Sequence, residues 1–333
     1  MTRLLVVRLG SLGDLVHTLP AVAAIRRVLP HVEIDWLVDA VHEEFLSLVP
    51  VITSAVRLRA PTPGGWVEVI RRLRGRRYDA ALDFQGLVKS ATLARLSGAP
   101  RVVGFDRPSL REAAAAPFYR EHVIIPAGVH VIEKNLRLAS AVGAPADAVE
   151  FPIVEPASPA LDIVRSRAPD GFVLVNPGAA WPNKRWPPDR FGRLARWIRD
   201  RYRARSVVLW GPGERELAAE VARHSGGAAA EAPPTRLPDL VALCRAARLI
   251  VSGDTGPTHI AAAVGTPVVA LFGPTDPGRN GPWSAGDISL SRYPECECHY
   301  ERRCRRTADR WCLGTISEDD VTRAVAARLG RTT

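Results

Sequence analysis

Lysine is nearly missing from this chain of 333 residues. Only Lys89, Lys134 and Lys184 occur, so the combined count of 45 Lys and Arg leaves 42 arginines. Where arginine has replaced lysine almost everywhere, each remaining lysine marks a candidate position that needs a compact ammonium instead of a planar guanidinium. Chance survival is the alternative. The formal net charge of +10 favours an acidic partner or surface without identifying its class.

Long apolar runs are missing as well. No run approaches the roughly 20 residues of a membrane-spanning helix. The first residues indicate a strand, Leu4–Leu9, and not a charged stretch followed by a signal-like apolar stretch, so we expect a cytosolic protein. Because 47% of the residues are apolar, the chain can bury a large core, and its length predicts two domains.

Several motifs with a known chemistry are absent too. The turn at Gly10–Asp14 (GSLGD) lacks the second-position and third glycines of a dinucleotide fingerprint. The chain has no G-x-x-x-x-G-K-[ST] phosphate loop, no G-x-S-x-G nucleophile elbow and no H-E-x-x-H metal motif. These absences weigh against dehydrogenases, kinases and hydrolases. The lack of a recognised motif or an aromatic-basic platform weighs against a nucleic-acid-binding protein.

The most informative segment is Val251–Pro277, VSGDTGPTHIAAAVGTPVVALFGPTDP. It predicts a buried strand over Leu249–Val251, a glycine-bracketed turn, a helix that begins near Pro257, and a second buried strand over Val268–Phe272. In a parallel sheet this helix directs its unpaired amides and the positive end of its dipole towards the turn. We therefore predict an anion site suited to a diphosphate.

Strands alternate with helices in both halves of the chain, which predicts an α/β fold with parallel sheets. We expect two domains, 1–155 and 170–316, joined by a proline-rich linker over about 151–169, and a final helix in 317–333 that packs back across the domains. Ligands of such sheets bind at the carboxyl ends of the strands. We therefore expect the two domains to face a cleft, with one side for each of two substrates.

Four segments of the chain resemble the heptosyltransferases of glycosyltransferase family 9. They are MTRLLVVRLGSLGDLVHTLPAVAAIRRVLP, ALDFQGLVKSATLAR, VNPGAAWPNKRWPPDRF and VSGDTGPTHIAAAVGTPVVALFGPTDP. The resemblance runs from residue 1 to about 325. It implies the GT-B architecture, with two Rossmann-like domains. It also implies inverting, metal-independent transfer of heptose from ADP-heptose to the inner core of lipopolysaccharide, on a Kdo- or heptose-bearing lipid A.

The resemblance further implies that the N-terminal half binds the acceptor, that the C-terminal half binds the nucleotide sugar, and that no cofactor is needed. An anionic, lipid-linked acceptor suggests peripheral contact with the cytoplasmic face of the inner membrane. Two alternatives stay open. One is a GT-B-fold epimerase acting on a nucleotide sugar, which needs no basic acceptor face. The other is a transferase that uses a different nucleotide sugar.

Asp14 matches the catalytic aspartate of the family, which removes the proton of the attacking acceptor hydroxyl. The alternative is an acid that only stabilises the start of its helix, and the helix dipole would lower its pKa there.

Lys184 matches a lysine that binds the donor diphosphate. Further donor-site matches are Asp254, Thr255, Gly256 and His259. The alternative is that Asp254 and Thr255 only cap the helix while His259 packs. Ala179 and Ala180 stand where the family has threonines, which puts side-chain contact in doubt there.

Adenosine contacts are less sharply defined. Glu214 or Glu216 would accept ribose hydroxyls, and the backbones of Thr235 and Leu237 would meet the base. Either acid could instead be an ordinary acid at a helix start.

Acceptor contacts are expected from the N-terminal half, at Lys89, Gln85, Gly13, Arg120 and His130. The arginine-rich stretch RRLRGRR (71–77) is either a further acceptor or membrane contact or a solvated helix face.

Four of the five cysteines, Cys296, Cys298, Cys304 and Cys312, follow one another closely with His299 between them. Their C-x-C-x5-C-x7-C spacing is not a standard zinc pattern, so the alternatives are a structural metal site or redox-linked loop on one side and ordinary surface-loop cysteines on the other.

Overall fold

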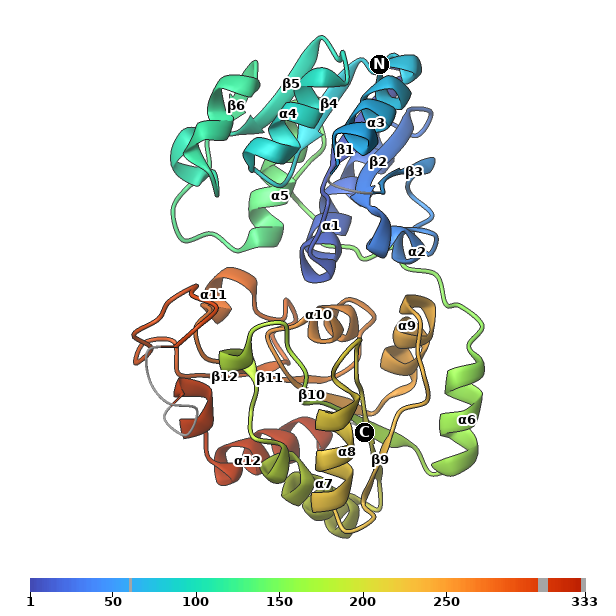
Figure 1. Ribbon diagram of the computed structural model, residues 1–333, viewed down its shortest axis with the longest axis vertical. Helices are drawn as coiled ribbons and strands as arrows, with labels where there is room; N and C mark the ends of the chain where they lie inside the picture. Colours follow the sequence, from blue (N-terminus) through green and yellow to red (C-terminus); the bar gives the residue numbers. More distant parts are fainter. Residues whose placement is uncertain (60–61, 305–310, 331–333) are drawn as a thin grey trace. The chain divides into compact units, whose positions relative to one another are not determined.

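The structure of the protein, a computed structural model, describes residues 1–59, 62–304 and 311–330. Within these ranges the chain forms two compact units, Met1–Val154 and Glu155–Thr333, each built around one six-stranded parallel sheet (Figure 1). The α/β fold predicted from the alternating strands and helices is confirmed.

The sheet of the first unit has the strand order β3-β2-β1-β4-β5-β6. Its strands are β1 (Arg3–Val7), β2 (Glu33–Asp39), β3 (Ser54–Leu58), β4 (Ala80–Asp83), β5 (Arg101–Phe105) and β6 (Glu121–Val123). Its helices are α1 (Leu12–Val28), α2 (Glu43–Leu46), α3 (Pro63–Arg76), α4 (Val88–Leu96) and α5 (Val131–Ala139), with short 3-10 turns that include η1 (Ala40–His42) and η3 (Ala113–Phe118).

Both faces of this sheet are buried, which explains the unbroken apolar run of β1. Leu5 and Val7 belong to one core cluster with Leu73 of α3 and Leu93 of α4. Leu4 and Val6 point to the opposite face and are fully buried as well. The helices α1 and α5 pack against each other.

The sheet of the second unit has the order β12-β11-β10-β7-β8-β9. Its strands are β7 (Phe172–Asn176), β8 (Arg205–Val208), β9 (Ala229–Glu231), β10 (Leu249–Gly253), β11 (Val268–Phe272) and β12 (Ile288–Ser291). Its helices are α6 (Pro159–Arg167), α7 (Pro188–Tyr202), α8 (Arg215–His224), α9 (Leu237–Ala246), α10 (Gly256–Ala263), α11 (Pro277–Asn280) and α12 (Glu318–Leu329), with 3-10 turns that include η5 (Pro182–Lys184) and η7 (Cys312–Thr315).

Counted within each unit, the two sheets have the same topology. The first strand lies at the centre, the second and third follow on one side, and the fourth to sixth follow on the other. The order therefore reverses between β1 and β4 in the first unit and between β7 and β10 in the second. In sheets of this kind ligands bind outside the carboxyl ends of the strands at such a switch point. Each unit thus has one location where a site is expected.

The segment expected as an irregular linker contains a helix. Pro159 is the first residue of α6, a position at which proline is favoured because its missing N–H needs no partner. Ser158 caps the helix by accepting from the Leu161 amide at 3.0 Å and donates to Asp239 at 2.7 Å. The proline-rich sequence therefore starts a helix of the second unit.

The C-terminal helix begins where the sequence predicted. Ser317 caps α12 by accepting from the Asp320 amide at 3.1 Å. The helix packs on α7 and on β11 and β12 of its own unit. Its packing across the domains stays a prediction. Among the described residues, no helix is both long and apolar enough to cross a membrane.

Candidate functional site

The switch point of the second unit brings Lys184 against the end of β10. A Cβ built on Gly253 would lie 2.6 Å from the Lys184 carbonyl oxygen, a distance that side chains do not tolerate. Only glycine therefore lets the loop after β7 lie directly on this strand end. This close approach places the Lys184 ammonium beside Asp254, the residue that follows β10.

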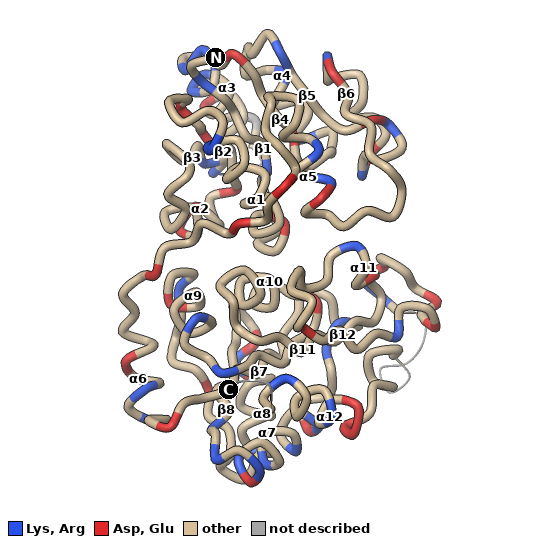
Figure 2. Tube along the Cα trace, turned by 180° about the vertical axis from the view of Figure 1, so that it is seen from behind, with Lys and Arg blue, Asp and Glu red and all other residues tan. Residues whose placement is uncertain are grey.

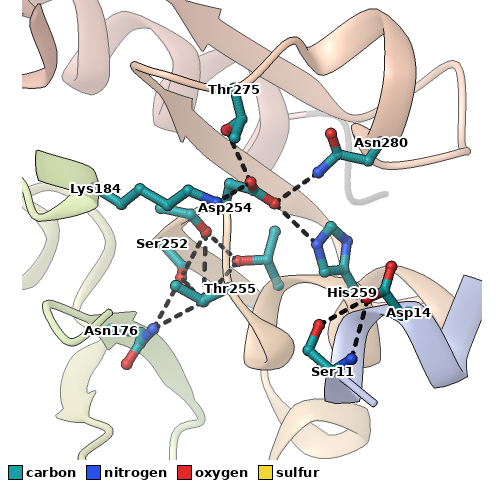
Figure 3. A network of polar contacts seen from close by, with 12 residues as sticks. Ser11, Asp14, Asn176, Lys184, Ser252, Asp254, Thr255, His259, Thr275 and Asn280 are labelled. Carbon is teal, nitrogen blue, oxygen red and sulfur yellow. Dashed lines mark hydrogen bonds and ion pairs between the residues drawn. The ribbon is translucent and has the colours of Figure 1, made fainter. Parts of the chain in front are cut away.

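Asp254 is the centre of a polar network (Figure 3). Its Oδ2 accepts from Lys184 Nζ at 2.5 Å and from Thr275 Oγ1 at 2.8 Å. Its Oδ1 lies 3.0 Å from His259 Nε2 and accepts from Asn280 Nδ2 at 2.8 Å. The residue is only 8% exposed. Four side chains, from the Lys184 loop, from α10 and from the segment after β11, thus converge on one buried carboxylate.

This network keeps Asp254 ionised. Burial by itself raises the pKa of the carboxyl, but the hydrogen bond with His259 and the charge of Lys184 outweigh burial and hold the pKa far below its ordinary value. The alternative that Asp254 only caps α10 is wrong, because both of its oxygens are used by other side chains. His259, in the first turn of α10, reaches back to Asp254 and does not merely pack.

A second set of hydrogen bonds shapes the turn between β10 and α10. Asn176, at the end of β7, donates to Ser252 Oγ at 3.0 Å and to Thr255 Oγ1 at 3.1 Å. Thr258 Oγ1 donates to the Gly253 carbonyl at 2.5 Å. Thr255 is the N-cap residue of α10 but makes no side-chain cap bond. The first-turn amides of the helix have no partner within the helix, so they point towards the switch point.

The loop that carries Lys184 is held on both sides. Arg185 donates to the Ala179 carbonyl through Nε at 2.9 Å and Nη2 at 2.7 Å. Asn183, 1% exposed, donates to the Glu301 carbonyl at 3.0 Å. The ammonium of Lys184 lies 4.5 Å from the centre of the Trp181 ring. These contacts fix the lysine before any ligand binds.

Asp14 lies at the switch point of the first unit, in the first turn of α1. Its Oδ1 forms an ion pair with Arg8 Nη2 at 2.5 Å. Its Oδ2 accepts from the Ser11 amide at 3.0 Å and from Ser11 Oγ at 3.2 Å. The side chain of Asp14 remains 23% exposed. The carboxylate therefore stabilises the start of its helix and at the same time presents an open side.

The turn after β4 lies next to this carboxylate along the same sheet edge. Gln85 accepts from the Leu9 amide at 2.8 Å and so ties the two central strands together. Lys89 forms an ion pair with Asp39 at 3.5 Å. A Cβ on Gly10 would lie 3.0 Å from His42 Nε2, so His42 belongs to the same cluster.

Comparison with known proteins decides the family. The family model described as glycosyltransferase family 9 (heptosyltransferase) matches residues 66–308. The lipopolysaccharide heptosyltransferase 1 of Pseudomonas aeruginosa is 34% identical over 314 residues, which cover 89% of this chain and 86% of that protein. The chain belongs to glycosyltransferase family 9. It is therefore a glycosyltransferase, and the resemblance seen in the sequence is confirmed.

Two further relatives of this family 9 protein agree. The lipopolysaccharide heptosyltransferase 1 of Escherichia coli K12 is 30% identical and covers 84% of this chain and 90% of its own. The solved structure of the E. coli heptosyltransferase WaaC with ADP has a TM-score of 0.79 at 24% identity and covers 98% of this chain and 100% of that one. This structural likeness shows the shared GT-B-like fold.

Most donor-site residues expected from the family 9 resemblance lie at the second switch point. Lys184, Asp254, His259 and the Thr255–Gly256 turn come together there. Thr235 lies in the loop between β9 and α9, and Leu237 is the first residue of α9.

The two glutamates proposed for ribose differ clearly. Glu214 turns back over the carboxyl edge: its Oε2 accepts from the Gly211 amide at 3.1 Å. A Cβ on Gly178 would meet the same oxygen at 2.2 Å, so Gly178 makes room for this side chain. Glu216 pairs with Arg223 on the surface, and its side chain is 83% exposed. Glu214 is therefore the better placed of the two glutamates, and the ribose contact stays a prediction.

The residues expected at the acceptor site lie in different parts of the first unit. Gly13 is buried in the first turn of α1, and His130 lies edge-to-face with His17, one turn beyond Asp14, at a ring distance of 5.9 Å. The acceptor role of Arg120 stays a prediction. The residue immediately precedes β6, so it lies at the amino end of an edge strand separated from β1 by β4 and β5.

The arginine-rich end of α3 also lies away from the predicted site (Figure 2). The helix ends at Arg76 and leads into the amino end of β4, the opposite edge of the sheet from Asp14. Arg76 pairs with the buried Asp35 at 3.1 Å, and Arg74 donates to the Leu96 carbonyl at 3.1 Å. Two of these arginines thus have structural partners within the unit.

The four clustered cysteines are not ordinary surface residues. Cys296, Cys298 and Cys312 form a buried cluster, with Cys304 packed against it. The Sγ atoms of Cys296 and Cys298 lie 3.7 Å apart as thiols, and burial raises the pKa of Cys298 to about 12. Among the described parts of the chain, no group of three or more ligand side chains is arranged to hold a metal ion. The cluster also contacts the Lys184 loop, since Asn183 donates to Cys298 Sγ at 3.9 Å.

Sequence reasoning missed Thr275, Asn280, Asn176 and Arg8. Thr275 stands within the conspicuous GPTDP sequence, which could have marked it as a switch-point residue. Asn280 carries no such signal, because its approach to Asp254 depends on how the short helix α11 folds back.

Proposed function

We propose that this family 9 enzyme transfers heptose from ADP-heptose to the inner core of lipopolysaccharide, with inversion at the anomeric carbon. The observation that best supports donor binding is the fixed ammonium of Lys184, which lies beside the first turn of α10 at the switch point of the second sheet. The names of the related proteins, lipopolysaccharide heptosyltransferases, support the acceptor class.

The donor diphosphate is expected to bind at this turn. The first-turn amides of α10 and the positive end of its dipole attract an anion, and the Lys184 ammonium adds a positive charge that its pair with Asp254 partly offsets. Asp254 is ionised and holds the lysine in place, so no rearrangement of the cation is needed as the leaving group develops charge. This arrangement supplies the charge that a divalent cation supplies elsewhere, so we propose transfer without a metal.

Glu214 and the loop before α9 complete the proposed donor site. Glu214 keeps a carboxylate at the carboxyl edge, where ribose hydroxyls would donate to it. The backbone of Thr235 and Leu237 is the candidate contact for the base. Ala179 offers no hydroxyl, and its carbonyl is already bonded to Arg185. The contact that family threonines make there is therefore not expected here.

Asp14 is proposed as the general base. As the acceptor oxygen forms its bond to the anomeric carbon, its proton moves to a carboxylate oxygen of Asp14. The bond between the anomeric carbon and the diphosphate oxygen breaks, and its electron pair leaves with ADP. Lys89, Gln85 and His130 are the candidate contacts for the acceptor, and a lipid-linked acceptor would bring the enzyme to a membrane surface.

Asp14→Asn tests this proposal directly. The variant is nearly isosteric and keeps the acceptor for the Ser11 amide, but its side chain cannot take up the proton. Transfer from ADP-heptose is expected to fall by at least a hundredfold, in line with the usual contribution of a general base. Calorimetry is expected to show unchanged ADP affinity. Turnover equal to that of the unmodified enzyme would remove Asp14 from the mechanism.

A screen of nucleotide sugars tests the donor. Release of free nucleotide is expected with ADP-heptose in the presence of an inner-core acceptor. Equal or faster release from a different nucleotide sugar would replace the donor in the proposal while leaving the transferase class intact.

A further inference from the structure

We propose that Arg8 is a positioning residue of the reaction, because its buried guanidinium fixes the orientation of the Asp14 carboxylate and keeps it charged. The proposal rests on the proposed role of Asp14 as the base. Arg8 follows β1 directly and lies at the switch point of the first sheet.

The contacts of Arg8 leave its guanidinium a single orientation. Nη2 forms the ion pair with Asp14 Oδ1 at 2.5 Å, and Nη1 donates to the carbonyl of Phe84, just beyond β4. The Arg8 carbonyl accepts from Trp36 Nε1 at 3.0 Å, which anchors the backbone on the neighbouring strand β2. Because the guanidinium is held by residues of the sheet, its ion pair holds the Asp14 carboxylate in a fixed position relative to the sheet.

Burial makes a purely stabilising role a poor explanation. The Arg8 side chain is 7% exposed, whereas that of Asp14 is 23% exposed. The guanidinium is thus more deeply buried than the carboxylate, which stays partly exposed. A buried ion pair usually adds little stability over apolar residues of similar size, because both charges must be desolvated. The buried charge of Arg8 is therefore better explained by what it does to the Asp14 carboxylate than by its contribution to stability.

The two oxygens of Asp14 are held in different ways. Oδ1 faces Arg8, and Oδ2 accepts from both the amide and the hydroxyl of Ser11. Rotation of the carboxylate would break contacts on both sides. Protonation of Asp14 would also weaken the ion pair, so Arg8 favours the charged form that can accept a proton from the acceptor.

Other ionisable groups near Asp14 do not replace Arg8. Burial lowers the pKa of His42 more than the nearby Asp39 and Asp14 raise it, so His42 is mainly neutral at neutral pH. Lys89 is paired with Asp39. Arginine stays charged at every pH at which the enzyme folds, so Arg8 supplies a permanent positive charge bonded to this carboxylate.

The test is the pH profile of kcat/KM for Arg8→Gln, with Arg8→Met as a second neutral variant and Arg8→Lys as the conservative one. Loss of a positive charge in contact with a carboxylate raises its pKa by about one unit or more. The acidic limb of the neutral variants is therefore expected to move to higher pH by about one unit, and kcat to fall. Arg8→Lys is expected to keep the limb near its original pH.

Arg26→Gln serves as the matched control. Arg26 is also in the first unit, but it lies near the far end of α1 and bonds to the carbonyls of Pro30, Val32 and Val51. Its substitution is expected to lower the melting temperature without moving the limb. Neutral Arg8 variants that lose activity equally at every pH, with the limb in place, would overturn the inference. An active Asp14→Asn would instead overturn the proposed base, so the two failures are distinguishable.

Discussion

Asp254 is both the centre of a buried polar network and the ion-pair partner of Lys184, two roles that a helix-capping aspartate could not combine. It is buried among four polar side chains, and its charge holds the Lys184 ammonium at the switch point. The sequence identified both residues, one from the glycine-bracketed turn and the other from the scarcity of lysine. It could not show that they bind each other, since 70 residues separate them and only the folded sheet brings them together.

Lys184→Met is expected to weaken ADP binding. A charge-assisted hydrogen bond contributes about 1.5–3 kcal/mol, which corresponds to a loss of affinity of roughly tenfold or more. Lys134→Met is the matched control, because Lys134 belongs to the first unit and lies 4.2 Å from the centre of the Phe105 ring. Titration calorimetry with ADP measures both variants. Equal affinity in the Lys184 variant and the unmodified enzyme would contradict the assignment.

Lys184→Arg addresses the idea drawn from the scarcity of lysine. The ammonium lies between Asp254 and the Trp181 ring, and a planar guanidinium has a different shape and reach. The arginine variant is therefore expected to recover only part of the ADP affinity. Full recovery would mean that charge alone matters at this position, and that the lysine survived by chance.

Asp254→Asn is expected to lower stability in a pH-dependent way. Breaking a buried ion pair leaves the Lys184 ammonium without its partner charge and costs about 3–5 kcal/mol. Because the pKa of Asp254 is lowered on folding, its contribution is present above the unfolded pKa of about 4 and is lost as the pH falls further.

The difference in melting temperature between Asp254→Asn and the unmodified enzyme measures this contribution. The difference is expected to be constant from pH 8 to 5 and to shrink below about pH 4. Asp147→Asn is a control, because the exposed pair of Asp147 with Arg27 contributes little. A difference that grows as the pH falls would contradict the ionised state of Asp254.

At the scale of elements, the site depends on how closely the loop before α7 lies on β10. A fully buried strand was well predicted: β11 has the expected bounds, because its apolar run is bounded by turn residues. The three-residue edge strands β6 and β9 carry too little pattern to be recognised. The helix α6 was missed because proline is both a helix breaker and a good first helical residue.

Gly253→Ala tests the close approach of the loop and the strand. The added Cβ would meet the Lys184 carbonyl, so we expect a loss of about 1–3 kcal/mol in stability, as for other overpacked sites, together with weaker ADP binding. Gly75→Ala is the matched control. It lies within α3 with no atom within 4 Å of the new Cβ, so stability is expected to rise by about 0.5–1 kcal/mol.

Chemical unfolding of both glycine variants, together with ADP titration, provides the measurement. Gly253→Ala with unchanged stability and unchanged ADP affinity would show that the loop can move away without consequence for the site.

At the scale of the whole molecule, two sheets with the same strand order each present one switch point. This repetition explains how the sequence could predict two ligand locations before any geometry was known. The net charge of +10 could not predict where a site lies, since the basic end of α3 is at the opposite sheet edge from Asp14. Net charge is a sum over the whole chain, whereas the location of a site depends on which residues the fold brings together at the carboxyl ends of the strands.

The second unit is proposed to bind the donor diphosphate at the turn after β10. Amide hydrogen exchange with and without saturating ADP tests this proposal on the intact chain. We predict slower exchange with ADP at residues 177–186 and 253–260, where the Lys184 loop and the first turn of α10 lie. Protection confined to Met1–Val154, with these two segments unchanged, would contradict the account.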